Sequence, residues 1–363
     1  MARSRVIEGA IRRAGEAVDR GALRVMARAM GRGRSRRPPG DARRRLQSIA
    51  AHYNTPANLA ADSAFFPSPA PPQVTETPQR PRAGAARAVD LAFASRWRPT
   101  VAAYVDEYAS YEANLTVRAR LLAAGDAPRP TAVFIHGWGG GAFWFEERAF
   151  AAAYWLRIGL DVAFVQLPFH GDRAPRQAPR SGALFPSAHI VRTNEAFGQA
   201  VHDVRALLAH LRQRGAPVVG VMGMSLGGYV TALLATVEPD LAFAIPIIPA
   251  ADMARLMWRR SDRSPQRRRA ERVGVDRTLL SDAFRVHAPL RREPVVPWER
   301  RMIVAGRSDR ITPPDQARDL WTHWGQPAIH WFPGGHLAQI GRGDAFRAIR
   351  RHLAGLGLAR PLR

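Results

Sequence analysis

Residues 218–229 read Val218-Val-Gly-Val-Met-Gly-Met-Ser-Leu-Gly-Gly-Tyr229 and contain the pentapeptide Gly-Met-Ser225-Leu-Gly. An apolar, strand-like run leads into the pentapeptide, and small and apolar residues typical of a helix follow it. A turn this tight between a strand and a helix needs glycine on both sides of the serine. The stretch predicts that Ser225 projects from such a turn. The structural alternative is a glycine-rich turn in which Ser225 only caps the helix.

A serine hydroxyl needs a base to act as a nucleophile at neutral pH, and the base needs a group that orients it. Of the eleven histidines, His336 follows the short strand-like run 328–332 and precedes the last helical segment. His330 lies inside that strand and His352 in the last helix. A loop at the end of a strand can reach a serine at a strand-to-helix turn, so His336 is the favoured base.

The candidate acid follows another expected strand. Asp309 comes directly after the strand-like run 301–305 and before a segment that begins with prolines and continues as a helix. A helix-capping aspartate is the alternative explanation, because Asp-x-x-Thr-Pro is also turn chemistry. Asp252, after the preceding strand, is the reserve candidate. We favour Asp309 as the carboxylate that orients His336.

A glycine-rich loop, His136-Gly-Trp138-Gly139-Gly-Gly, follows the expected strand at 131–136. Glycines allow main-chain N–H groups to approach a substrate oxygen closely. We expect an oxyanion hole that uses the N–H of Leu226 and that of Trp138 or Gly139. The loop does not fit a phosphate site, because it lacks both the Gly-Lys-Ser/Thr ending and the G-x-G-x-x-G spacing.

Short apolar runs alternate with helix-length segments through most of the chain. This alternation predicts an α/β fold with a mostly parallel sheet and helices on both faces. The expected strands are 89–97, 115–122, 131–136, 161–167, 218–222, 241–248, 301–305 and 328–332. The expected helices are 146–160, 190–213, 226–237, 314–324 and 345–353. The mainly helical, polar segment 251–299 interrupts the alternation and is interpreted as an inserted cap.

The order of oxyanion loop, serine, aspartate and histidine resembles that of the α/β-hydrolase superfamily, over residues 89–356. The resemblance implies the α/β-hydrolase fold, with Ser225 as nucleophile, His336 as base and Asp309 as orienting acid. It implies no metal and no cofactor. The run 167–173 resembles the loop that lines the pocket in that superfamily, and the candidate substrate-binding residues are His136, Phe169, Met224, Met257 and Trp258.

Subfamilies that use another nucleophile are disfavoured. Haloalkane dehalogenases and epoxide hydrolases carry aspartate at this turn, where this chain has Ser225. The chain also contains no cysteine, which argues against enzymes that resemble dienelactone hydrolases or polyester synthases and excludes disulfides and thiolate metal sites.

The composition suits a globular protein, since 46% of its 363 residues are hydrophobic and 23% charged. The net charge is +24, and every basic side chain is arginine. Lysine is absent while alanine, glycine and proline are abundant, so part of this charge reflects a GC-rich coding bias. We exclude nucleic acid as a partner, because no recognised module and no interleaved aromatic residues accompany the basic runs.

The chain divides into three expected segments. Residues 1–55 form a basic extension, in which apolar residues at three- and four-residue spacing predict an amphipathic helix. We expect this helix to pack on the main domain, with binding to a membrane surface or a partner as the alternative. Residues 56–85 form a proline-rich linker or strap. Residues 86–363 form the hydrolase domain, with the cap at about 251–299.

The sequence predicts a serine hydrolase that cleaves a carboxylic ester through an acyl-enzyme. An acyltransferase or membrane-surface lipid deacylase with the same triad, and an inactive hydrolase fold used for binding, are the alternatives. Residues 255–301 hold 14 arginines and six acidic residues, so an anionic or lipid ester and peripheral contact with an anionic membrane are further expectations. No signal peptide or membrane-spanning run is evident, and we expect a cytoplasmic protein of undetermined oligomeric state.

Overall fold

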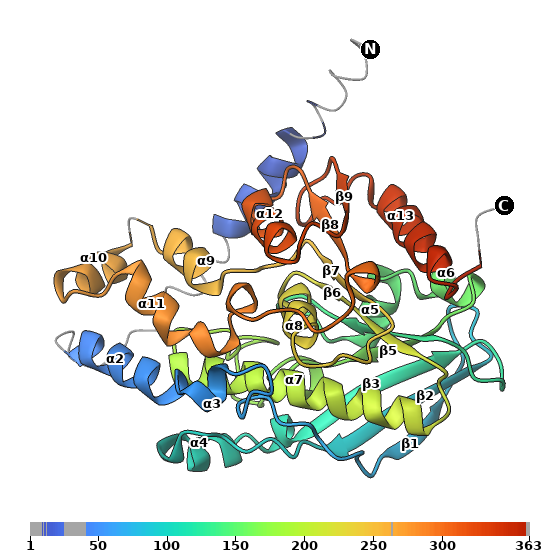
Figure 1. The fold of residues 1–363 in the computed structure, drawn as a ribbon, viewed down its shortest axis with the longest axis horizontal. Coiled ribbons are helices and arrows are strands. Elements are labelled where there is room, and N and C mark those ends of the chain that lie inside the picture. The colour runs from blue at the N-terminus through green and yellow to red at the C-terminus, as the bar shows by residue number, and fades with distance from the viewer. Residues whose placement is uncertain (1–8, 10, 12, 25–40, 263, 361–363) are drawn as a thin grey trace.

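A nine-stranded sheet organises the computed structural model, which describes residues 9, 11, 13–24, 41–262 and 264–360. The strand order is β1-β2-β3-β5-β4-β6-β7-β8-β9 (Figure 1). The pairs from β1 to β5 are antiparallel, and those from β5 through β4 to β9 are parallel. The strands are β1 Thr75–Gln79, β2 Arg87–Ala94, β3 Thr116–Ala123, β4 Thr131–Ile135, β5 Asp161–Val165, β6 Val219–Met224, β7 Ala244–Ile247, β8 Met302–Gly306 and β9 Ala328–Phe332.

Helices cover both faces of the sheet, as the sequence predicts. The α-helices are α2 Ala42–Tyr53, α3 Pro56–Leu59, α4 Val105–Ala109, α5 Phe143–Ala149, α6 Ala152–Arg157, α7 Ile190–Gln213, α8 Leu226–Leu234, α9 Met253–Arg260, α10 Pro265–Arg272, α11 Arg277–Ala283, α12 Pro314–His323 and α13 Arg342–Gly355. Short 3-10 helices are η2 Ala102–Tyr104, η3 Glu112–Leu115, η4 Gly171–Arg173, η5 Arg285–His287, η6 Pro289–Arg291 and η7 Trp298–Arg300.

Two apolar cores lie on opposite faces of the sheet. Along β4, Val133 and Ile135 belong to the core that packs against α7, α8 and α12, whereas Ala132 and Phe134 belong to the core under α6 and α13. Every residue of β4, β5 and β8 is buried. Because side chains alternate between faces along a strand, a central strand covered on both faces must be apolar throughout. The predicted fold class is therefore confirmed.

Two elements differ from the sequence-based expectation. The helix expected over 146–160 is two helices, α5 and α6, because Ala151 between them has a positive φ of 53° and cannot continue an α-helix. The proline-rich segment also contains a strand, β1, which pairs with β2 alone and is mostly exposed. An edge strand tolerates Pro78, because one side of its backbone has no partner strand.

Part of the basic extension is helical in the residues described. Residues 13–24 form the N-terminal helix, and α2 follows at Ala42–Tyr53. The described part of the N-terminal helix does not pack through the expected apolar face. Val18 is 47% exposed, whereas Gly15 and Asp19 are buried. The amphipathic helix predicted for the basic extension also relies on apolar residues at positions 6, 7, 25, 26 and 29, which lie outside the described residues. The N-terminal helix is blue in Figure 1 and contacts the loops that follow β8 and β9.

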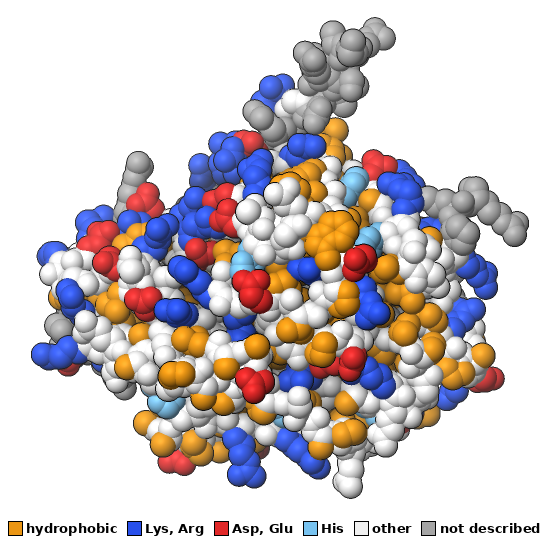
Figure 2. All heavy atoms as spheres, viewed as in Figure 1, with side chains coloured by type: hydrophobic (Ala, Val, Ile, Leu, Met, Phe, Trp, Pro, Cys, Tyr) orange, Lys and Arg blue, Asp and Glu red, His pale blue; other side chains and the backbone are white. Residues whose placement is uncertain are grey.

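The segment 251–299 carries three α-helices, α9, α10 and α11, joined to the rest by ion pairs. On α9, Arg255 lies 2.6 Å from Asp319 and Arg259 lies 2.8 Å from Asp315, both on α12. Figure 2 shows basic side chains spread over the face in view, with acidic side chains among them. Part of the positive charge of this segment is thus paired inside the molecule.

Among the residues described, we find no helix whose length and apolar character would let it cross a bilayer.

Candidate active site

Ser225 occupies a sharp turn between β6 and α8. Its backbone has φ 59° and ψ −109°, a region that non-glycine residues rarely adopt. A Cβ placed on Gly227 would lie 2.0 Å from the carbonyl oxygen of Ile135, and one on Gly223 would lie 2.1 Å from that of Gly227. Neither neighbour of the turn can therefore carry a side chain, which is the arrangement that the pentapeptide predicts.

The structure brings Ser225, His336 and Asp309 together from three loops at the carboxyl ends of β6, β9 and β8. Ser225 Oγ lies 2.9 Å from His336 Nε2, and His336 Nδ1 lies 2.7 Å from Asp309 Oδ2. Ser225 is partly exposed, whereas His336 and Asp309 are buried. The serine hydroxyl can therefore meet a substrate while the two groups behind it are shielded from water.

Asp309 is held by its own loop. Its Oδ1 accepts hydrogen bonds from the main-chain N–H groups of Ile311 (2.8 Å) and Thr312 (2.7 Å), and its Oδ2 accepts from the Thr312 hydroxyl (2.9 Å). An ionised carboxylate is an acceptor only, so its contact with His336 places the imidazole proton on Nδ1. That tautomer leaves Nε2 with a lone pair directed at Ser225.

Thr312 belongs to this site although no catalytic sequence motif singles it out. Its hydroxyl lies 3.0 Å from His336 Nδ1 and 2.9 Å from both Asp309 Oδ2 and the carbonyl oxygen of Ile248. The available signal was the Asp-x-x-Thr spacing, which is the pattern of a capping turn. The Asp309 carboxylate thus closes this turn and contacts His336 at the same time.

The other acid and histidine candidates lie elsewhere. The Asp252 side chain caps α9 by accepting a hydrogen bond of 2.9 Å from the N–H of Arg255. His330 lies within β9 and His352 within α13, as expected. Asp309, not the reserve Asp252, is the carboxylate that contacts the His336 imidazole.

The glycine-rich loop after β4 passes next to Ser225. A Cβ on Gly137 would lie 3.5 Å from the Cβ of Ser225. The Trp138 indole donates a hydrogen bond of 2.7 Å to the carbonyl oxygen of Gly182, and the Arg180 guanidinium lies 4.7 Å from the centre of the Trp138 ring. These contacts anchor the loop, and Gly139 within it has a positive φ of 81°.

His136 is buried and hydrogen-bonded to main-chain groups, whereas a substrate contact is expected for it from the sequence. Its Nε2 accepts a hydrogen bond of 3.0 Å from the N–H of Leu167, so its proton is on Nδ1, 2.8 Å from the carbonyl oxygen of Gly137. The side chain is 1% exposed, and burial lowers its pKa to about 4. The neutral ring therefore joins the two loops that follow β4 and β5.

Phe169 is also buried, at 1% exposure, rather than open to a substrate. Its N–H donates a hydrogen bond of 3.0 Å to Asn114 Oδ1, and its ring meets Tyr111 edge to face at 5.1 Å between centroids. Its φ is 61°, which indicates a turn held by its surroundings. The physical reason for both corrections is the same: the loop after β5 folds inward and is secured by buried polar groups.

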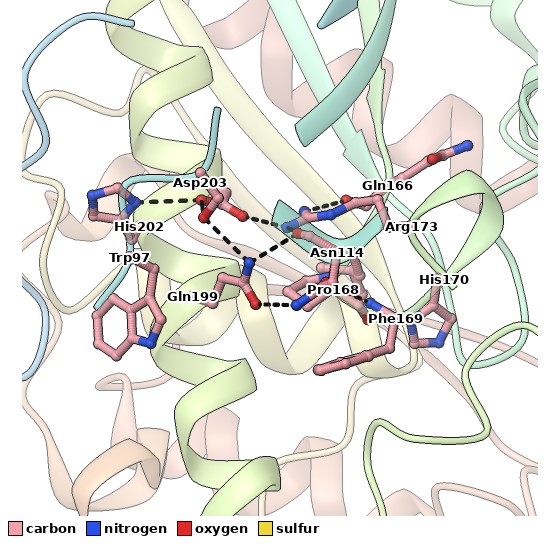
Figure 3. A network of polar contacts seen from close by, with 12 residues as sticks. Trp97, Asn114, Gln166, Pro168, Phe169, His170, Arg173, Gln199, His202 and Asp203 are labelled. Atoms are coloured by element: carbon pink, nitrogen blue, oxygen red, sulfur yellow. Dashed lines mark hydrogen bonds and ion pairs between the residues drawn. The ribbon is translucent and has the colours of Figure 1, made fainter. Parts of the chain in front are cut away.

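A buried polar network supports this loop (Figure 3). The Arg173 guanidinium donates to Asp203 on α7 (2.7 Å) and to the carbonyl oxygens of Gln166 (3.0 Å) and Asn114 (2.9 Å). Asn114 donates to Gln199 of α7 at 2.8 Å. Arg173 and Asp203 are 0% and 1% exposed. The network fixes the loop after β5 against α7 and against η3, which precedes β3.

The remaining predicted substrate contacts are partly exposed. Met224 precedes Ser225, and its sulfur accepts a hydrogen bond of 3.3 Å from the Gln339 amide, on the loop that carries His336. Met257 and Trp258 lie on α9 and pack against the larger core. The Trp258 ring is covered by the Arg267 guanidinium at 4.3 Å. The structure thus places Met224 at the site and the other two on the inserted segment.

Sequence comparison identifies relatives of the chain. Residues 89–256 match the family model described as "Alpha/beta hydrolase domain containing 18". Uncharacterized proteins from two strains of Mycobacterium tuberculosis are each 35% identical over 260 residues, which is 69% of this chain and 59% of the relative. The chain thus spans less than two thirds of the length of these relatives.

Solved structures share the fold. The acetyl xylan esterase from Paenibacillus sp. R4 is 16% identical with a TM-score of 0.53, over 86% of this chain and 94% of that one. Acetyl xylan esterase 1 from Thermoanaerobacterium sp. JW/SL YS485 is 15% identical with a TM-score of 0.55, over 86% and 98%. At such identities the likeness concerns the fold. The chain therefore has the α/β-hydrolase fold, and its residues 89–256 match an α/β-hydrolase family model.

Proposed function

We propose that the protein is a serine hydrolase that cleaves carboxylic esters, with Ser225 as nucleophile, His336 as general base and Asp309 as the orienting acid. One observation carries the proposal: continuous hydrogen-bond geometry from Ser225 Oγ to His336 Nε2 (2.9 Å) and from His336 Nδ1 to Asp309 Oδ2 (2.7 Å). Both distances are within hydrogen-bond reach, the geometric requirement for an activated nucleophile.

In the first half-reaction, Ser225 Oγ attacks the acyl carbonyl carbon while His336 Nε2 takes the hydroxyl proton. The imidazolium that forms keeps its hydrogen bond to Asp309, whose charge stabilises it. The tetrahedral intermediate then collapses. The bond from the acyl carbon to the alcohol oxygen breaks, His336 returns the proton to that oxygen, and the acyl group stays on Ser225.

The negative charge on the carbonyl oxygen needs donors that are already in place. The N–H of Leu226 is at the first position of α8, where helix N–H groups have no partner within the helix and carry partial positive charge. The second donor is the N–H of Trp138 or Gly139, in the loop that lies against Ser225 at Gly137. These two donors are assigned to the oxyanion hole.

The second half-reaction repeats these steps with water. His336 Nε2 removes a proton from a water molecule, and the resulting hydroxide attacks the acyl carbon. Collapse of the second intermediate breaks the bond to Ser225 Oγ, which regains its proton from His336, and the carboxylic acid leaves. The reaction uses only side chains and main-chain groups of the protein, so the proposal includes neither metal nor cofactor.

The test is a substrate profile of the full chain across ester, thioester, amide and phospholipid substrates. p-Nitrophenyl acetate is a suitable first probe, since two solved structures with this fold are named acetyl xylan esterases. Ser225→Ala is the blank and should remove nearly all turnover, on the order of 10⁶-fold where a triad acts as a unit. Ser225→Ala protein that is folded and fully active contradicts the proposal.

Labelling separates the alternatives. A fluorophosphonate should attach to wild-type protein at Ser225 and leave Ser225→Ala unlabelled. Wild-type protein that is labelled but hydrolyses no ester points to acyl transfer or to a lipid substrate, and a phospholipid assay distinguishes these two. Folded wild-type protein that is not labelled contradicts the nucleophile assignment and favours a binding function for the fold.

A further inference from the structure

Asp19 of the N-terminal helix is buried against the loops that carry the proposed acid and base. Its Oδ2 accepts hydrogen bonds from the main-chain N–H groups of His336 (2.8 Å) and Arg310 (3.0 Å), and its Oδ1 accepts from that of Leu337 (3.0 Å). The residue is 0% exposed. One carboxylate thus binds the residue after Asp309 and the proposed base itself.

Two glycines allow the helix to approach this closely. A Cβ on Gly15 would lie 2.9 Å from the main-chain nitrogen of Gly335 and 3.5 Å from the Cβ of Ser308. A Cβ on Gly335 would lie 2.8 Å from Asp19 Oδ2 and 3.1 Å from the carbonyl oxygen of Gly15. The backbone of the N-terminal helix therefore contacts the backbone of the loop at 333–340, which carries His336, and a side chain at either glycine would separate them.

A charge pair lies at the edge of the same contact. Glu16 lies 2.9 Å from the Arg310 guanidinium and 3.3 Å from that of Arg20. The contact face of the helix is thus defined by Gly15, Glu16 and Asp19, while Val18 faces solvent with 47% of its surface exposed. This face of the helix therefore binds specific main-chain N–H groups and is not an apolar packing surface.

The first residues of the loop at 333–340, the histidine loop, are tied to the Asp309 loop by Ser308, whose N–H donates to Gly334 (3.1 Å) and whose hydroxyl donates to Pro333 (2.7 Å). These bonds do not reach His336 or Leu337. Gly334 N–H donates to Ile340 (3.0 Å), Gly335 N–H donates to Ala338 (3.0 Å), and both of these bonds stay inside the loop. Asp19 links this loop to residue 310, on the loop of Asp309. A carboxylate that accepts from both loops restricts their relative movement, on which the distance from His336 to Asp309 depends.

We infer that Asp19 is a positioning residue of the active site and that the N-terminal helix, remote in sequence from the triad, completes it. The inference rests on the proposed function for its kinetic consequence. Its structural part, the fixing of the loops at 307–312 and 333–340 by one carboxylate, stands on the contacts above. Small displacements of reacting groups cost up to about 10²-fold in rate, so the carboxylate acts on catalysis without touching the substrate.

The experiment compares four full-length variants with the wild type: Asp19→Ala, Asp19→Asn, Gly15→Ala and Val18→Ala. Asp19→Ala removes all three acceptor contacts. Asp19→Asn keeps one acceptor oxygen, and Gly15→Ala keeps the carboxylate but separates the helix from Gly335. Val18→Ala changes the solvent-facing side of the same helix and is the matched control. Circular dichroism checks that each variant is folded.

Two readouts are used for each variant. The first is kcat and KM for p-nitrophenyl acetate. We expect Asp19→Ala and Gly15→Ala to lower kcat by about 10- to 100-fold with little change in KM, Asp19→Asn to be intermediate, and Val18→Ala to match the wild type. The second is hydrogen–deuterium exchange, in which the amides of Arg310, His336 and Leu337 should exchange faster in the Asp19 variants and in Gly15→Ala.

The two readouts separate this inference from the proposed function. If wild-type protein hydrolyses none of the esters in the substrate profile, the proposed function fails and exchange alone decides the positioning role. Folded Asp19→Ala with wild-type exchange at 307–312 and 333–340 overturns the inference in either case. In an active enzyme, faster exchange with unchanged kcat also overturns it, because the carboxylate would then hold the loops without serving catalysis.

Discussion

The N–H of His336 donates a 2.8 Å hydrogen bond to Asp19, 317 residues earlier in the chain. A contact of this kind gives the N-terminal helix a defined place, because a carboxylate buried without partners would be strongly destabilising. Three main-chain N–H groups supply the partners. In the part of the basic extension that the structure describes, the acidic residues Asp19 and Glu16 make the contacts with the loops of the proposed acid and base.

Replacing Thr312 with valine should impair the proposed reaction. The change keeps the side-chain shape but removes the hydroxyl that contacts Asp309 Oδ2, His336 Nδ1 and the Ile248 carbonyl. A hydrogen bond to a charged group contributes about 1.5–3 kcal/mol, and 1.4 kcal/mol corresponds to a factor of ten. We expect kcat/KM for p-nitrophenyl acetate to fall by about 10-fold or more.

Thr312→Ser is the control for that variant, because serine restores the hydroxyl without the methyl group. It should recover most of the activity lost in Thr312→Val. Equal activity of Thr312→Val and wild type would show that Asp309 orients His336 without help from the hydroxyl.

The buried pair of Arg173 and Asp203 should dominate the stability of the loop after β5. Arg173→Met leaves Asp203 as a buried carboxylate without its cation, which typically costs about 3–5 kcal/mol in the free energy of unfolding. Urea denaturation measures this cost. Fluorophosphonate labelling of Ser225 should continue in any fraction of the variant that remains folded, because the hydrogen bonds of the pair run to Gln166, Asn114 and Ser95 and not to the triad.

A double-mutant cycle tests whether the cost comes from the unpaired charge. Arg173→Met combined with Asp203→Leu removes both charges, so the double variant should be less destabilised than the sum of the single variants. Strict additivity of the two single effects would mean that the partners do not interact.

Glu146 should make the stability of the protein depend on pH. It lies on α5, is 4% exposed and accepts a hydrogen bond of 2.9 Å from the N–H of Gly141. Burial raises the pKa of Glu146 to about 7, partly offset by this hydrogen bond. The folded state therefore holds a proton that the unfolded state has released above its ordinary pKa near 4.5.

The contribution of Glu146 to stability is thus complete below about pH 4.5 and is lost as the pH rises toward 7, by linkage. Glu146→Gln removes the titration and keeps an acceptor. Between pH 4.5 and 8, the free energy of unfolding of wild type should fall relative to Glu146→Gln by on the order of 2–3 kcal/mol. Urea denaturation across this range measures the difference, and parallel pH profiles would contradict the assignment.

Much of the fold follows from local sequence signals. The bounds expected for α7 and β9 match the structure, and the buried central strands follow from their continuous apolar runs. Local signals miss the break at Ala151, because no glycine or proline marks it. They also miss β1, since Pro78 argues against a strand unless its edge position is known.

Local sequence signals likewise predict some residues of the candidate site and miss others. The three loops of Ser225, His336 and Asp309 each carry a local signature and were predicted to meet, as they do. The substrate contacts expected for His136 and Phe169 do not fit their burial, because a position next to a loop in sequence does not tell which way a side chain faces. Asp19 has no signature at all, since its partners are main-chain groups of distant loops.

The strained backbone of Ser225 leads to a last prediction. A side chain held at φ 59° and ψ −109° stores on the order of 1–3 kcal/mol of conformational strain, which glycine does not suffer. Ser225→Gly and Ser225→Ala should both be inactive, but Ser225→Gly should be at least as stable as Ser225→Ala in urea denaturation. At an ordinary interior helical position such as Ala209 of α7, by contrast, glycine should lower the free energy of unfolding by about 1 kcal/mol. If Ser225→Gly is less stable than Ser225→Ala by as much as Ala209→Gly is than wild type, the turn is not strained.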